Sequence, residues 1–249
     1  MKLEKFMKME TIKKLPNILT VIRALLVPVF MVMIIFNNPL GGSIRIFKED
    51  YTVCIVGAAI FLLISLTDML DGKIARKYNA VTDFGKFLDP IADKLLVMGG
   101  MLALIIYYTQ RTIWRGYNVL ILSMVFSLFV IITRELAVTS LRMICKDSGG
   151  PVIAANMAGK IKTVSQIVFI IAALIEPWVF RVILGWFGVQ YPPTIQVITY
   201  ASLAVMTFMT IYSGVNYFIL YLPYLKKANE KDDGTETKDE EVSENKTEE

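Results

Sequence analysis

The sequence contains no histidine. Without an imidazole group the protein cannot use a Ser-His-Asp or Cys-His arrangement, a histidine general base or a histidine metal ligand. Any metal site must therefore be built mainly from oxygen ligands, which suit Mg²⁺, Mn²⁺ or Ca²⁺. Carboxylates are then the candidates for both acid–base catalysis and metal binding.

Cysteine is scarce as well. The chain has two, Cys54 and Cys145, and they lie far apart in apolar or near-membrane surroundings. We interpret both as buried, unpaired thiols, which argues against a disulfide framework and against a thiolate metal site.

Charge is scarce too: 19% of the residues are charged, 55% are hydrophobic, and the mean hydropathy is +0.55. Soluble domains usually have about 45–50% apolar and about 25% charged residues. The acids are unevenly distributed, because residues 226–249 hold 10 of the 22. The composition predicts an integral membrane protein with a polar tail. We expect membrane lipid, and no nucleic acid, among its partners.

Apolar runs predict six membrane-spanning helices and hence an all-α integral membrane protein. Each run is near the ~20 residues needed to cross a bilayer. The third is the weakest, because its strictly apolar part from Leu95 to Tyr108 is short and needs the turn at 89–94 as a polar beginning. The predicted spans are residues 17–36, 52–71, 89–108, 117–143, 160–180 and 194–222.

These spans and their flanks divide the chain into three parts. Residues 1–16 are basic and amphipathic, which predicts an interfacial helix along the anionic leaflet rather than a cleavable signal peptide. Residues 17–225 form the predicted six-helix transmembrane domain. Residues 226–249 are polar with few apolar side chains, which predicts a disordered tail.

Lys and Arg are concentrated on one side of this topology. With the N-terminus in the cytosol, the cytosolic segments carry nineteen of the 26 Lys and Arg residues and the outer connections carry five. Positive residues are retained on the cytosolic side of membranes. The sequence therefore predicts a multi-pass protein of the cell (plasma) membrane with both termini, and the segment 72–94, in the cytosol.

Five aspartates lie in residues 68–93, between two apolar runs. Asp68 and Asp71 are three residues apart, and Asp89 and Asp93 are four apart, so on helices each pair shares a face. The seventeen residues between the pairs can form a turn that brings them together. Four adjacent carboxylates repel unless cations lie among them. The pattern predicts a cytosolic site for one or two divalent metal ions that clamp a diphosphate.

Small and basic residues accompany these carboxylates. Gly72 and Gly85 carry no side chain that would block a ligand. Arg76, one helical turn beyond Gly72, could pair with a phosphate through two hydrogen bonds. Helix-capping aspartates with surface salt bridges are the alternative explanation for any one carboxylate.

The motif Asp-x2-Asp-Gly-x2-Ala-Arg-x8-Gly-x3-Asp-x3-Asp at residues 68–93 resembles the signature of the CDP-alcohol phosphatidyltransferases at every defined position. The resemblance implies the CDP-alcohol phosphotransferase fold and two ions of Mg²⁺ or Mn²⁺. Asp93 would hold metal and act as general base on the acceptor hydroxyl. The remaining metal ligands would be Asp68, Asp71 and Asp89. The residues that would line the CDP site are Gly72, Arg76 and Gly85.

The first predicted span opens with "LPNILTVIRALLVP", residues 15–28. Asn17, Thr20 and Arg23 recur every three residues, which places them along one side of a helix. The segment resembles the N-x-x-T-x-x-R element of the same transferases, which implies that Asn17 and Thr20 contribute to the nucleotide site. The alternative is a helix cap at Asn17 and an Arg23 that snorkels to the membrane surface.

Two further segments are basic at their cytosolic ends. Arg134 and Arg142 lie eight residues apart, about two turns, at the end of the fourth span. Lys160, Lys162 and Thr163 open the fifth, where an anion would balance the cations at a helix start. These groups suit an anionic phosphate; anchoring to the leaflet is the alternative.

Glu135 is adjacent to Arg134 in the sequence. Neighbouring residues diverge on a helix, so we expect that the two side chains do not simply neutralise each other. The strings "REL" and "SLR", followed by "GKIKT", resemble the branch of the family that uses glycerol 3-phosphate as acceptor.

The resemblance implies transfer of the phosphatidyl group of CDP-diacylglycerol to sn-glycerol 3-phosphate, which gives phosphatidylglycerol phosphate and CMP in phospholipid biosynthesis. It also implies a homodimer. The acceptor phosphate would bind Arg134, Arg142, Lys160, Lys162 and Thr163. The alternatives are a family member that uses inositol phosphate or serine, a divalent-cation transporter, and a non-catalytic membrane scaffold.

Overall fold

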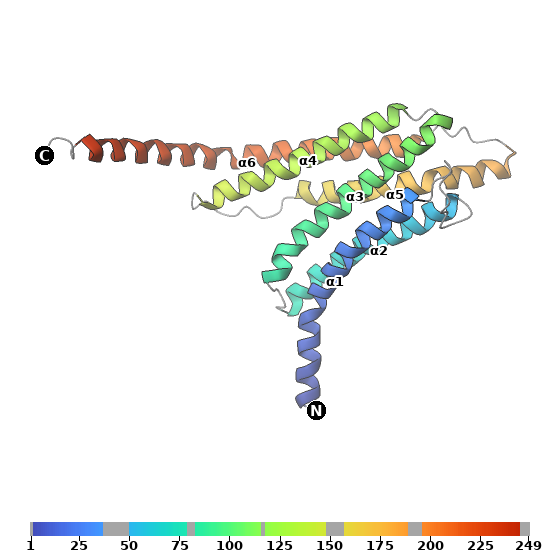
Figure 1. The fold of residues 1–249 in the computed structure, drawn as a ribbon, viewed down its shortest axis with the longest axis horizontal. Coiled ribbons are helices and arrows are strands. Elements are labelled where there is room, and N and C mark those ends of the chain that lie inside the picture. Colours follow the sequence, from blue (N-terminus) through green and yellow to red (C-terminus); the bar gives the residue numbers. More distant parts are fainter. Residues whose placement is uncertain are drawn as a thin grey trace. The chain divides into compact units, whose positions relative to one another are not determined.

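The computed structural model describes the backbone of residues 2–36, 50–78, 83–115, 118–147, 157–188 and 196–244. It describes side chains over narrower ranges, namely 18–36, 52–67, 85, 87–110, 118–145, 157–180, 182–188 and 196–224. Within this part of the chain every regular element is an α-helix (Figure 1). The helices are α1 (Lys2–Phe36), α2 (Asp50–Tyr78), α3 (Asp83–Arg115), α4 (Asn118–Asp147), α5 (Met157–Trp186) and α6 (Val197–Glu244).

Five helical segments are long and apolar enough to cross a membrane: Ile18–Phe36, Phe87–Gln110, Asn118–Cys145, Met157–Trp186 and Val197–Tyr224. A sixth apolar segment, Thr52–Thr67 of α2, is shorter. Large apolar side chains are exposed along these helices; on α4, Leu122 is 72% and Phe126 58% exposed. The all-α, multi-pass membrane architecture predicted from the sequence is thus confirmed. The count of six spans stays a prediction.

The ends of two helices differ from the predicted boundaries. α1 runs without interruption from Lys2, so the expected interfacial segment and the first span belong to one helix. α6 continues to Glu244, into the segment for which we expected disorder. The division of the chain into three parts, with a disordered tail at residues 226–249, stays a prediction.

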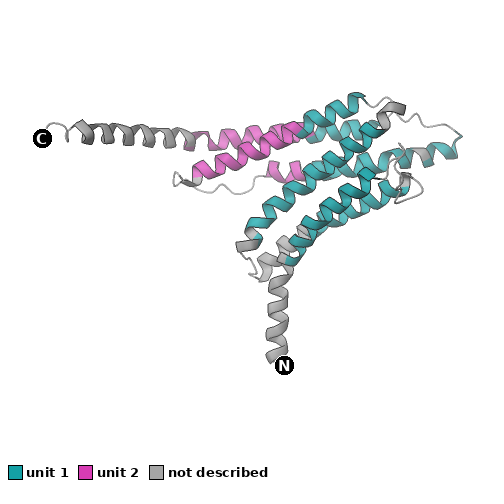
Figure 2. Cartoon of the chain, in the orientation of Figure 1, with its two compact units in different colours: residues 1–128, 164–206 teal, residues 129–163, 207–249 magenta. Residues whose placement is uncertain are grey.

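The chain divides into two compact units (Figure 2). Unit 1 comprises residues 1–128 and 164–206, and unit 2 comprises residues 129–163 and 207–249. Each of α4, α5 and α6 contributes to both units.

In unit 1, α1 packs against α2 and α3. The approach of α1 to α3 is close at Gly99, where an added Cβ would lie 2.9 Å from Val27 Cγ1. Phe30 of α1 and Phe61 of α2 are buried with ring centroids 5.5 Å apart. Small residues let helix backbones approach in membranes, and Gly99 lies at such a close approach of α3 to α1.

Glu176 of α5, also in unit 1, is buried at the start of α6. Its Oε1 accepts a hydrogen bond from the backbone N–H of Ile198 at 2.9 Å. Its Oε2 accepts from the N–H and the hydroxyl of Thr199, each at 2.6 Å. The first N–H groups of a helix have no partner within the helix. A carboxylate from the preceding helix therefore caps α6.

Unit 2 has a small core of its own, formed by Val138, Cys145, Tyr217 and Tyr221. The rings of Tyr217 and Tyr221, one turn apart on α6, are stacked with centroids 6.3 Å apart. Cys145 and, in unit 1, Cys54 are buried and neither forms a disulfide, as expected from the sequence. The Cys54 thiol shares a hydrogen bond with the Tyr107 hydroxyl at 2.9 Å.

Candidate active site

Asp89 and Asp93 lie one turn apart near the start of α3, and α1 donates a hydrogen bond to each. The hydroxyl of Thr20 donates to Asp89 Oδ1 at 2.7 Å. The Nη1 group of Arg23 donates to Asp93 Oδ1 at 2.9 Å. The three-residue spacing on α1 thus matches the four-residue spacing on α3. Both carboxylates are oriented from the same neighbouring helix.

Arg23 is buried, 2% exposed, whereas the side chain of Asp93 is 54% exposed. A buried guanidinium is stable in apolar surroundings when it is paired, so the snorkelling alternative is wrong for Arg23. Arg23 was not among the residues predicted to form the site. The signal was its recurrence with Asn17 and Thr20, which predicts one side of a helix but not the partner.

The other half of the aspartate motif lies on α2, which is helical through Asp68 and Asp71. The side chains of these two residues lie outside the described part of the chain, as do those of Asn17, Gly72 and Arg76. Gly85 is described and is buried near the start of α3. Among the described side chains no three acidic or cysteine residues group to hold a metal ion. The four-aspartate site stays a prediction.

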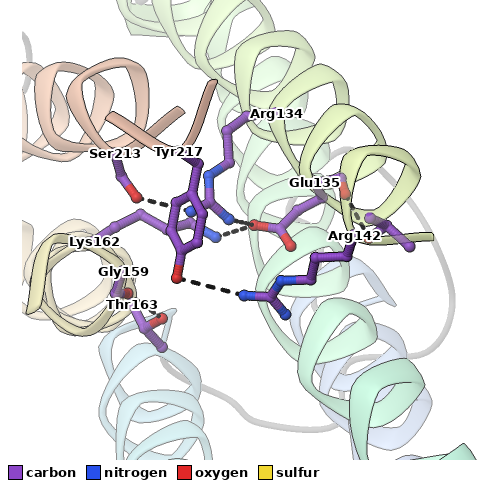
Figure 3. Close-up of polar contacts among 9 residues, drawn as sticks. Arg134, Glu135, Arg142, Gly159, Lys162, Thr163, Ser213 and Tyr217 are labelled. Atoms are coloured by element: carbon purple, nitrogen blue, oxygen red, sulfur yellow. Dashed lines mark hydrogen bonds and ion pairs between the residues drawn. The ribbon is translucent and has the colours of Figure 1, made fainter. Parts of the chain in front are cut away.

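Unit 2 contains a basic cluster built around Glu135 (Figure 3). Arg134 Nη1 donates to Glu135 Oε1 at 3.0 Å, and Lys162 Nζ donates to the same oxygen. The expectation that Arg134 and Glu135 diverge is therefore wrong. The rule for neighbouring helical residues concerns the direction of Cβ, and the long arginine side chain folds back over its neighbour.

Tyr217 of α6 forms an aromatic platform for both arginines of α4. The guanidinium carbons of Arg134 and Arg142 lie 5.2 and 5.4 Å from the centre of its ring, within the range of cation–π attraction. Arg142 Nη2 also donates to the tyrosine hydroxyl, at a long 3.4 Å. Arg134 Nη2 donates to Ser213 Oγ at 2.7 Å. Arg134 and Arg142 therefore share one face of α4, as predicted.

The remaining predicted acceptor residues lie on the first turns of α5. Lys160 is exposed. Thr163 is exposed, and its hydroxyl donates to the carbonyl of Gly159 in its own helix at 3.2 Å. Among the contacts of the described residues, neither side chain joins the cluster. Of the five candidates, the structure brings Arg134, Arg142 and Lys162 together.

Three residues of the cluster were absent from the predicted site: Glu135, Ser213 and Tyr217. Ser213 and Tyr217 lie 79 and 75 residues from the arginines they contact. No local spacing rule connects residues so far apart. Glu135 was visible as an intramembrane acid, which is a functional signal in itself.

Comparisons with known proteins identify the family of this chain. A profile of the CDP-alcohol phosphatidyltransferase family matches residues 13–193. A Bacillus subtilis (strain 168) protein named CDP-diacylglycerol--glycerol-3-phosphate 3-phosphatidyltransferase is 38% identical over 218 residues, which cover 86% of this chain and 98% of that protein. A Mycoplasma genitalium (strain G37) protein of the same name is 35% identical over 176 residues, 68% of this chain and 67% of that protein. A Mycobacterium tuberculosis (strain H37Rv) protein named "Probable phosphatidylglycerophosphate synthase" is 32% identical over 206 residues, 83% and 80%.

The chain therefore belongs to the CDP-alcohol phosphatidyltransferase family, and it is an enzyme of that family. The matched region contains the whole aspartate motif at 68–93. The family is generally metal-dependent. Asp89 and Asp93 offer oxygen ligands from one face of α3, and such a donor set fits Mg²⁺ or Mn²⁺.

Proposed function

We propose that this enzyme transfers the phosphatidyl group of CDP-diacylglycerol to sn-glycerol 3-phosphate, producing phosphatidylglycerol phosphate and CMP. The observation that carries the proposal is the basic cluster of unit 2. Arg134 and Arg142 lie over the ring of Tyr217, and Arg134 and Lys162 both donate to Glu135. Converging cations suit a phosphate group on the acceptor. The name of a relative matched over 98% of its length supports the same reaction, as does the name of a second relative matched over 67% of its length.

The donor would bind at the aspartate motif. Mg²⁺ or Mn²⁺, in two positions, would be held by Asp68, Asp71, Asp89 and Asp93. When bound, such ions neutralise diphosphate charge and stabilise the departing CMP. Thr20 fixes the orientation of Asp89. The residues proposed to bind the cytidine diphosphate are Asn17, Thr20, Gly72, Arg76 and Gly85.

The acceptor phosphate would be held by Arg134, Arg142 and Lys162, with Lys160 and Thr163 at the rim. Arg134 and Lys162 are mostly buried, with 11% and 8% of their side chains exposed. Hydrogen bonds between charged groups are strengthened where water is excluded. Arg142 is exposed and available to an incoming anion.

The chemical step is a displacement at phosphorus. Asp93 accepts the proton of the primary hydroxyl of the acceptor, and that oxygen forms a bond to the β-phosphorus of CDP-diacylglycerol. The bond from the β-phosphorus to the bridging oxygen breaks, and its electrons leave with CMP. Arg23 donates a hydrogen bond to the Asp93 carboxylate and orients it. A carboxylate is a weak base at neutral pH, so correct placement contributes much of its effect.

The other candidate acceptors match the cations of unit 2 less well. Serine has no phosphate and would leave the three cations of the cluster without a matching group. Inositol phosphate carries a phosphate but brings a bulky ring of hydroxyls. The relatives named for glycerol 3-phosphate favour the smaller acceptor. We also propose a cytosolic active site in the plasma membrane, cytosolic termini, and a homodimer.

The experiment is CMP release by the detergent-purified protein with CDP-diacylglycerol and Mg²⁺ or Mn²⁺. Glycerol 3-phosphate, inositol phosphate and serine are compared in parallel, with Asp93→Asn as the control for chemistry. Release with glycerol 3-phosphate alone, lost in Asp93→Asn, is the expected result. Release with a different acceptor would keep the aspartate site and discard the assignment of the basic cluster.

A further inference from the structure

Glu135 has no part in the chemical step, yet it lies at the centre of the basic cluster of unit 2 (Figure 3). One of its oxygens, Oε1, accepts hydrogen bonds from Arg134 on its own helix and from Lys162 on α5. Arg134 and Lys162 are thereby held beside each other, although they come from different helices. The second guanidinium nitrogen of Arg134 is held by Ser213 of α6.

All three charged groups are poorly exposed, and Glu135 itself has 16% of its side chain exposed. Where little water is present, two cations as close as these repel each other strongly unless an anion lies between them. A single carboxylate removes this repulsion and leaves the group of three with one net positive charge. The cluster is therefore formed before an acceptor arrives, and it still attracts a phosphate.

We propose that Glu135 is a positioning residue of the acceptor site, holding Arg134 and Lys162 together in the free enzyme so that a phosphate monoester meets a formed binding site. The inference rests on the proposed function, because it takes these two cations as ligands of the acceptor phosphate. Ordering long side chains weakens binding when it happens at the moment of association. Glu135 performs that ordering during folding instead.

The test is Glu135→Gln, which keeps the size of the side chain and removes its charge. We expect the KM for glycerol 3-phosphate to rise roughly tenfold, because two long side chains must then be ordered on binding. The kcat and the KM for CDP-diacylglycerol should stay within about twofold, since neither depends on Arg134 or Lys162. Inorganic phosphate, used as a competitor of the acceptor, should lose inhibitory strength by a similar factor.

An unchanged or lower KM for glycerol 3-phosphate in Glu135→Gln would overturn the proposal. It would mean that Glu135 is a bystander or competes with the phosphate. Glu135→Asp keeps the charge on a shorter stem, so we expect a smaller rise in KM. If Glu135→Gln does not yield folded protein, Glu135→Asp decides alone: a KM equal to that of the wild type would overturn the proposal.

Thr139→Val is the matched control. The Thr139 hydroxyl donates to the backbone carbonyl of Glu135 at 2.7 Å. Its kinetic constants should equal those of the wild type. Wild-type protein that releases no CMP with glycerol 3-phosphate would refute the proposed function. Active wild type with an unaffected Glu135→Gln would refute only the role of Glu135.

Discussion

Replacing Arg23 with methionine separates the catalytic value of its ion pair from its structural value. The guanidinium is buried, and it donates to the half-exposed Asp93 at 2.9 Å. Methionine fills a similar apolar volume and removes the charge. The variant therefore removes the hydrogen bond from Arg23 to Asp93 and also removes a buried cation from α1.

The structure sets the expected magnitudes. A hydrogen bond to a charged group is worth about 1.5–3 kcal/mol. If Asp93 loses that much orientation in the transition state, kcat falls roughly 10- to 150-fold, because 1.36 kcal/mol is a factor of ten. Stability should change much less, by about 1 kcal/mol or less. The variant no longer has to bury a charged group, and this gain offsets the free energy lost with the ion pair. Water can solvate the exposed Asp93.

The assay is CMP release at saturating substrates, beside thermal unfolding in the same detergent. Arg23→Lys, which keeps the charge but loses the planar group, should retain an intermediate kcat. In an Asp93→Asn background Arg23→Met should add little further loss, because the pair acts as a unit. A wild-type kcat in Arg23→Met, or a loss explained entirely by unfolding, would refute the reasoning.

Four further outcomes follow from the described contacts. Tyr217→Leu should raise the KM for glycerol 3-phosphate roughly tenfold through loss of two cation–π contacts, whereas Tyr217→Phe should change it less than about threefold; steady-state kinetics decide. Gly99→Leu should lower the free energy of unfolding by about 1–3 kcal/mol through overpacking against α1, measured by denaturation in detergent, and an unaffected melt would contradict the close approach. Glu176→Ala should lower the same free energy by about 2 kcal/mol with both KM values unchanged, because the start of α6 loses its cap. EDTA should abolish CMP release, and excess Mg²⁺ or Mn²⁺ should restore it; activity that survives EDTA would remove the metal from the mechanism.

The correct predictions for this protein came from the spacing of residues along individual helices. The apolar runs located the helices, and the intervals between aspartates placed Asp89 and Asp93 on one face of α3, because helical periodicity is a local property. The recurrence of Thr20 and Arg23 showed a polar side of α1. What spacing could not show was that this side meets α3, since that depends on the packing of two helices about 70 residues apart in sequence.

The errors also have physical reasons. The divergence expected of Arg134 and Glu135 considered backbone direction and neglected the reach of a long side chain. Tyr217 and Ser213 were out of reach, because an apolar helix with scattered tyrosines and serines does not indicate which of them faces a cation.

The cap that Glu176 provides affects how the start of α6 is determined. A helix start is normally encoded by the residue just before it, so lengthening the preceding loop risks moving the start. Here the first amides of α6 are fixed by a carboxylate more than twenty positions earlier. The connection between α5 and α6 therefore does not have to determine where α6 starts. We expect that its length can change while α6 still starts at the same residue, so that Ser213 and Tyr217 keep their positions along the helix.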